Sequence, residues 1–294
     1  MIYDLTHLTR YRYGAPVVVN DCVLRLRPRD EPGQTVSDFR IEAQPAARDW
    51  SVREDAFGND VTRLRIETSH TVMSIRSVSR VEVSRAAPPI AALTPPWEDI
   101  ASQAAASQSL APDSPAFALY PSRLVSLFPA AGAYARESFP GGRPIYEAAV
   151  ELNRRIKADF AYDSKATEVT TAPADAFAAR RGVCQDFAHV MIAGLRCLSL
   201  PALYVSGYIR TIPPPGKPRL AGADASHAWV AVWCGPSFGW LGLDPTNAIP
   251  EGDDHIVVAR GRDYADVPPV DGVILSYGGH ELEVAVDVIP VESK

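Results

Sequence analysis

A helical segment bounded by glycine and proline lies in the second half of the chain. Between Cys184 and Leu198, large apolar side chains recur at three- and four-residue intervals, the spacing of a helix with a buried face. Gly182 precedes the segment and Pro201 follows it, and these residue types commonly end helices. The sequence therefore predicts a helix that begins near Cys184 and packs on other elements.

The residues that follow have the two-residue period of antiparallel strands. Residues 227–234 alternate in character, and a Gly-Pro turn separates them from a second strand that ends at Asp244. One pairing register sets Trp229 opposite Asp244, and a register slipped by two residues sets His227 opposite Asp244. Because pairing preserves parity, both registers place His227 and Asp244 on the same face of the hairpin.

Three side chains in these segments have complementary chemistry. Cys184 would lie in the first turn of its helix, where free N–H groups and the helix dipole favour a thiolate. Its own N–H is also placed to bind an oxyanion. His227 can accept the thiol proton, and Asp244 can hold the imidazole tautomer. The pattern indicates a nucleophile, a base and an orienting group.

At these residues the chain resembles the transglutaminase-like superfamily of papain-like thiol enzymes. The matching pieces are Gly182-Val183-Cys184 opening a helix, His227-Ala228-Trp229 opening a strand and Asp244-Pro245-Thr246 closing the next. The start of the chain, residues 3–28, is similar to the N-terminal region of bacterial transglutaminase-like proteins. The resemblance implies that Cys184 is the nucleophile, His227 the base and Asp244 the third member of a triad.

The second oxyanion donor is not assigned by this resemblance. Papain has a glutamine six positions before its cysteine, where this chain has Ala178. Animal transglutaminases use an upstream tryptophan, but no tryptophan lies between Trp97 and Trp229 here. Tyr162 and Gln185 are the candidates for this donor. Trp229 shares a strand face with His227, so it is a candidate for the cleft wall or for shielding the imidazole from water.

The expected fold is α+β in three parts. Residues 1–85 contain short alternating segments rich in β-branched side chains, which predict a β-sandwich domain. Residues 86–144 are rich in proline and alanine, so they allow only short helices, such as 97–107 and 122–128. We interpret them as a connector packed on both domains. Residues 145–294 form the papain-like, transglutaminase-like core, with the cysteine helix on an antiparallel sheet.

Composition restricts the partners and the compartment. The chain has 294 residues, 47% of them hydrophobic, and a net charge of −6 without a long basic run, which argues against nucleic acid or a membrane as partner. The N-terminus lacks the pattern of a signal peptide, and no apolar stretch is long enough to span a membrane. Four widely spaced cysteines suggest a reducing compartment, so a cytoplasmic location is expected. They are Cys22, Cys184, Cys197 and Cys234.

Metal binding is not expected. Cys184 and His189 lie about 140° apart around a helix, so they do not share a face, and His189 is expected to make a hydrogen bond in the core. The segment 253–255, Asp-Asp-His, is either a cation site or a solvated loop, and the loop is favoured. The proline-rich segment 213–218 leads to His227 and is expected to border the substrate cleft.

The predicted activity is acyl transfer on amides of a peptide or protein substrate, without a cofactor. Water as acceptor makes the enzyme a cysteine peptidase or amidase, and a lysine side chain makes it a transglutaminase. Hydrolysis is favoured because water needs no second pocket. The alternative from another class is a non-catalytic interaction module on the same fold.

Overall fold

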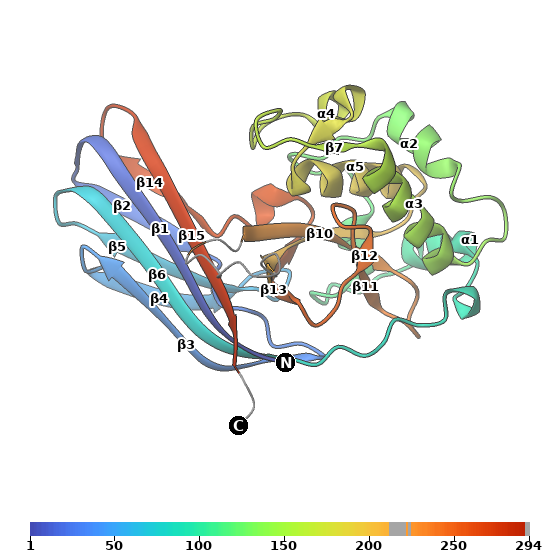
Figure 1. Cartoon of the computed structure of the whole chain (residues 1–294), viewed down its shortest axis with the longest axis horizontal. Helices are drawn as coiled ribbons and strands as arrows, with labels where there is room; N and C mark the ends of the chain where they lie inside the picture. Colours follow the sequence, from blue (N-terminus) through green and yellow to red (C-terminus); the bar gives the residue numbers. More distant parts are fainter. Residues whose placement is uncertain (212–221, 223–224, 292–294) are drawn as a thin grey trace, which may run out of the picture.

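The computed structural model describes residues 1–211, 222 and 225–291 (Figure 1). The proline-rich segment 213–218 lies outside the described residues. A β-rich half and a mixed half with all the labelled helices lie side by side in Figure 1. This arrangement is the α+β fold that the sequence predicts.

The β-rich half is a sandwich of two four-stranded sheets. Their strand orders are β15-β1-β6-β3 and β14-β2-β5-β4, and every pairing within them is antiparallel. An apolar cluster that includes Leu24, Ile66 and Ile75 forms part of its core. Each strand expected before residue 85 is present. The strands are β1 (Ile2–Val17), β2 (Val19–Leu24), β3 (Gln34–Gln44), β4 (Asp49–Glu54), β5 (Asp60–Ile66) and β6 (His70–Val83).

Two strands from the end of the chain complete these sheets. β14 (Val270–Leu275) pairs with β2, and β15 (His280–Pro290) pairs with β1. The sequence predicted that residues 145–294, and therefore both strands, belong to the transglutaminase-like core. For these two strands that prediction is wrong. Alternation along a strand reveals a buried face, but it carries no information about which distant strand will pair with it.

The connector contains short helices, as expected, but one lies at a different place. η1 (Ala91–Leu93), α1 (Trp97–Ala105), η2 (Pro115–Ala118) and α2 (Pro129–Arg136) occur in this region. The chain over 122–128 is not helical, and α2 begins only at Pro129. Phe128 is extended, with φ −138° and ψ 141°, because a following proline disfavours the helical conformation.

The mixed half is built on a five-stranded antiparallel sheet of order β12-β11-β10-β9-β13. Helix α5 packs on one face of this sheet through Ala228, Val230 and Val232. No helix in the described part of the chain is long and apolar enough to cross a membrane. The helices are α3 (Ile145–Asp159), α4 (Pro173–Ala179), α5 (Cys184–Cys197) and η3 (Tyr264–Asp266). The strands are β7 (Ala161–Tyr162), β8 (Arg181–Gly182), β9 (Ala202–Ile209), β10 (Ala225–Trp233), β11 (Trp240–Asp244), β12 (Ile249–Pro250) and β13 (His255–Gly261).

The two halves meet along strand β13, the edge strand that the sequence analysis did not anticipate. The side-chain amide of Gln34 donates to the carbonyl of Val257 and accepts from its N–H, both at 2.8 Å. Asn59 makes the same paired contact with Arg260, at 2.7 and 2.8 Å. These amides satisfy backbone groups that an edge strand would otherwise leave open. The sandwich thus packs on the core sheet as well as on the connector, where Phe57 lies edge-on to Phe117 with ring centroids 6.2 Å apart.

We expect the two halves to unfold together. They share an apolar cluster in which Tyr3 and Leu5 of the sandwich contact Tyr208 and Ile256 of the core sheet. Loss of either half would expose this surface, so calorimetry should show one transition whose calorimetric and van't Hoff enthalpies agree. Two separated transitions would instead show that the halves are independent domains.

Candidate active site

The first turn of α5 holds Cys184 at a defined position. The carboxylate of Asp186 accepts hydrogen bonds from the Val183 N–H at 2.8 Å and from the Thr167 hydroxyl at 2.6 Å. This contact closes the turn around Cys184, which is half-buried. Sequence reasoning missed Asp186, although an acidic residue at the third helical position is a known capping signal.

The hairpin β10–β11 brings His227 and Asp244 together. Val230 pairs with Leu243, which is the first of the two registers, with Trp229 opposite Asp244. The Nε2 of His227 lies 2.8 Å from the Oδ2 of Asp244. The Cys184 thiol is one of the groups that raise the pKa of the same imidazole. Since Nε2 contacts Asp244, Nδ1 is the ring nitrogen that remains for the thiol.

Asp244 is held by its own turn as well as by His227. Its Oδ1 accepts from the N–H groups of Thr246 at 2.9 Å and Asn247 at 3.2 Å. Its Oδ2 also accepts from the Asn247 side-chain amide at 2.7 Å, and the Nε2 of His255 lies 3.3 Å away. The carboxylate is fully buried. The turn explains why an aspartate at this place can hold one orientation.

The contacts around His227 and Asp244 favour the charged form of both side chains. Burial disfavours the imidazolium, but the hydrogen bonds to Asp244 and Cys184 outweigh it and raise the pKa of His227 to about 10. Burial also disfavours the carboxylate, but the hydrogen bonds from His227 and His255 hold the pKa of Asp244 well below its ordinary value. Together these shifts favour a proton on His227 at neutral pH.

These shifts predict a pH dependence of stability. The raised pKa of His227 gives stability that is complete below its ordinary value of 6.5 and lost as the pH rises through about 10. The lowered pKa of Asp244 gives stability that is present above its ordinary value of 3.8 and lost at lower pH. The difference in unfolding free energy between wild type and Asp244→Asn, measured in urea, should therefore peak between these two ordinary values. A difference that does not change with pH would contradict the ion pair.

Two candidates for the second oxyanion donor lie beside the thiol, and their side chains differ in availability. Tyr162 pairs with Gly182 through the parallel bridge β7–β8, and its side chain is exposed. Partial burial of its hydroxyl and the nearby Cys184 raise the pKa of the hydroxyl, so it keeps its proton. Gln185 is buried, and its amide donates to the Val169 carbonyl at 2.9 Å. Tyr162 is the more available donor.

Trp229 does not have the position of an oxyanion donor. The ring is fully buried, and its N–H donates to the Oε2 of Glu251 at 2.6 Å. It stacks on His227 with ring centroids 6.0 Å apart. The ring therefore packs beside the imidazole, and its full burial does not fit the expected cleft wall.

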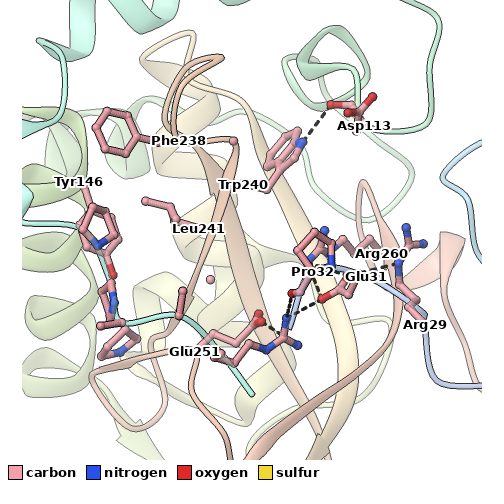
Figure 2. Close-up of a pocket in the computed structure, with 18 of the residues that line it drawn as sticks. Arg29, Glu31, Pro32, Asp113, Tyr146, Phe238, Trp240, Leu241, Glu251 and Arg260 are labelled. Atoms are coloured by element: carbon pink, nitrogen blue, oxygen red, sulfur yellow. Dashed lines mark hydrogen bonds and ion pairs between the residues drawn. The ribbon is translucent and has the colours of Figure 1, made fainter. Parts of the chain in front are cut away.

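The other oxygen of Glu251 connects this site to the N-terminal half. A pocket of about 560 Å³ lies at the junction of the halves, with Glu31, Glu251 and Arg260 among its walls (Figure 2). Arg85 bridges Glu31 at 2.8 Å and the Oε1 of Glu251 at 3.0 Å. None of the three proposed triad residues lines this pocket. The cluster of Glu31, Arg85 and Glu251 instead holds the Trp229 ring in position through the hydrogen bond between the ring and Glu251.

In the segment Asp253-Asp254-His255, Asp253 and Asp254 form a turn with Asp253 exposed, whereas His255 begins strand β13 and is buried. Asp253 accepts from the N–H of Arg85, and Asp254 accepts from the Tyr3 hydroxyl, both at 2.8 Å. His255 is buried beside Asp244. Among the described residues, the nitrogen and oxygen atoms of His227, Asp244 and His255 that could bind a metal ion lie within 4.8 Å of one another. Hydrogen bonds join both imidazoles to the carboxylate of Asp244.

The structure also shows the surroundings of His189 and of the other three cysteines. The Nε2 of His189 accepts from the Tyr264 N–H at 3.2 Å, and burial lowers its pKa to about 4, so the expected core hydrogen bond is confirmed. Cys22 and Cys234 are buried, and Cys197 is half-buried at the far end of α5.

Comparisons with known proteins extend over the whole chain. A protein of Mycobacterium tuberculosis is 41% identical over 297 residues, covering 99% of this chain and 93% of that protein. A protein of Mycobacterium leprae is 31% identical over 287 residues, covering 97% of each. A solved structure of a candidate cysteine protease from Cytophaga hutchinsonii has a TM-score of 0.71 at 21% identity, covering 100% of this chain and 92% of that one.

The family models match each half separately. Residues 3–82 match the bacterial transglutaminase-like N-terminal region, and residues 132–245 match the transglutaminase-like superfamily. The second match contains the start of α5 and the hairpin β10–β11. The chain therefore belongs to the transglutaminase-like superfamily.

Proposed function

We propose that this protein is a thiol-dependent acyl-transfer enzyme that cleaves peptide or side-chain amides, as a cysteine peptidase or amidase. One observation carries the proposal: the buried imidazole of His227 lies 2.8 Å from the carboxylate of Asp244, and the thiol of Cys184 is among the groups that raise the pKa of this imidazole. A non-catalytic interaction module would have no need for this ordered set of three groups. Its membership of the superfamily and its likeness to a candidate cysteine protease support an enzyme.

The proposed reaction proceeds through a thioester. The thiolate of Cys184 attacks the amide carbonyl, and the resulting oxyanion accepts from the Cys184 N–H and from a second donor, for which we propose Tyr162. The C–N bond breaks as His227 gives its proton to the leaving amine. His227 then takes a proton from water, and the hydroxide attacks the thioester. The C–S bond then breaks, the carboxylic acid leaves, and Cys184 returns to the thiolate beside a protonated His227.

The acceptor decides between two activities of one site. Water releases an acid, whereas a lysine amine gives a new amide and makes the protein a transglutaminase. The same three side chains carry out both reactions. We propose hydrolysis, because water reaches the thioester without a dedicated acceptor pocket. We also propose a peptide or protein substrate, no nucleic-acid or membrane partner, no cofactor and a cytoplasmic location.

The test is selective alkylation along a single helix. Cys184 and Cys197 lie at opposite ends of α5 and are both half-buried, so they are a matched pair. Iodoacetamide at about pH 6, with peptide mass spectrometry, should modify Cys184 well before Cys197, because in the proposed site an imidazole activates the Cys184 thiol, whereas burial raises the pKa of Cys197. Equal rates would refute an activated nucleophile. Amide substrates offered with and without a primary amine would then separate hydrolysis from transfer.

A further inference from the structure

A second imidazole contacts the carboxylate of Asp244. The Nδ1 of His255 accepts from the Gly252 N–H at 3.2 Å, so Nε2 carries the ring proton. That Nε2 lies 3.3 Å from the same Oδ2 that His227 contacts at 2.8 Å. His255 is therefore a neutral donor to Asp244, placed there by a backbone group of its own turn.

Several contacts hold His255 in this position. Its ring packs edge-on against Trp229, with centroids 5.2 Å apart and planes at 71°, and the N–H of Trp229 is held by Glu251. Gly207 of strand β9 pairs with His227 of β10 and with Val257 of β13, and an added Cβ there would lie only 2.6 Å from the indole of Trp229. Gln34 bonds the backbone of Val257, two residues after His255. The site is built from both halves of the chain.

We propose that His255 is a positioning residue of the acyl-transfer site: it shares the Oδ2 of Asp244 with His227 and weakens the hold of Asp244 on the His227 proton. This inference rests on the proposed function. A carboxylate oxygen that accepts from two imidazoles offers less negative charge to each of them. His227 can then give its proton to a leaving amine more readily, because a general acid works best when its proton is not held too strongly.

The charged or titratable groups around His227 come from three elements, which are α5, β11 and β13. Cys184 of α5 is among the groups that raise the pKa of the imidazole, Asp244 of β11 binds it, and His255 of β13 lies beside it, with ring centroids 6.3 Å apart. Glu251 reaches the site only through Trp229. Removing the N–H of His255 therefore leaves Asp244 as a stronger partner for the imidazolium.

The experiment compares His255→Leu with His255→Gln, whose amide keeps an N–H donor at similar reach. We expect His255→Leu to lower kcat for amide hydrolysis about tenfold with little change in KM, because a general acid whose pKa rises by about one unit holds its proton about tenfold more strongly. In the same variant, the alkaline step in the rate of Cys184 alkylation should move to higher pH by about one unit. His255→Gln should restore most of both properties.

The control is His7→Leu, which removes another buried imidazole. The two nitrogens of His7 bond the hydroxyls of Tyr208 and Thr9, away from Asp244. A thermal melt will show how far each variant is destabilised. A wild-type alkylation profile in His255→Leu, or the same shift in His7→Leu, would overturn the proposal. If wild type cleaves no amide, the proposed function fails, whereas the alkylation step still decides the role of His255.

Discussion

Cys184→Ala is expected to abolish amide turnover, by a factor of about 10⁶, the size of effect known for removing the nucleophile of a triad. Without the sulfur no thioester can form, and the residual rate reflects binding and the oxyanion site alone. The melting temperature should stay within a few degrees of wild type, because the side chain is half-buried at a helix start and alanine suits a helix. Steady-state kinetics and a thermal melt on the same preparation test both statements.

The matched control is Cys197→Ala at the other end of the same helix. Its thiol lies 3.6 Å from the Phe128 carbonyl, and burial raises its pKa, so it has the environment of a packing residue. We expect this variant to keep wild-type turnover. Comparable turnover in Cys184→Ala would rule out the proposed mechanism, and unfolding of that variant would show that Cys184 is a packing residue.

His227→Ala is expected to reduce turnover nearly as far as loss of the thiol, while Asp244→Asn should cost up to about 10⁴. The larger loss follows because His227 serves as both acid and base in the proposed reaction. The smaller figure is the loss known for this replacement in a serine triad, where the amide favours the wrong tautomer. Single-turnover kinetics should show that Asp244→Asn slows thioester formation, since proton transfer belongs to that step.

Asp244→Asn should also destabilise the fold, so its effect on turnover needs a control. Both oxygens of Asp244 accept hydrogen bonds, and an amide can accept at only one of its two positions. Asp263→Asn is the matched variant, since this fully buried carboxylate accepts from the N–H groups of Leu124 and Ala265. It should lose stability and keep most of its turnover. Equal losses of turnover in both variants would contradict the special role of Asp244.

Local pattern in the sequence was enough to predict the elements that carry the proposed triad. Helix α5 begins at Cys184 as expected, because apolar periodicity and bounding glycine and proline residues act over a few residues. The common face of His227 and Asp244 also followed from the sequence, since strand pairing preserves parity in any register. The choice between two registers needed the structure, which selects the one with Trp229 opposite Asp244.

Tertiary structure alone decided which distant segments meet. The alternation in β15 marks a half-buried strand, yet only the folded chain shows that it pairs with β1, nearly the whole chain length away. The sequence around His255 is typical of a surface loop, whereas the structure places His255 in β13 beside Asp244. No pattern in the sequence indicates that Gln34 bonds the backbone of β13, as the structure shows. The physical reason is that periodicity reflects burial of one element's own face. A long-range contact depends instead on which surfaces are left to bury once all the elements have formed.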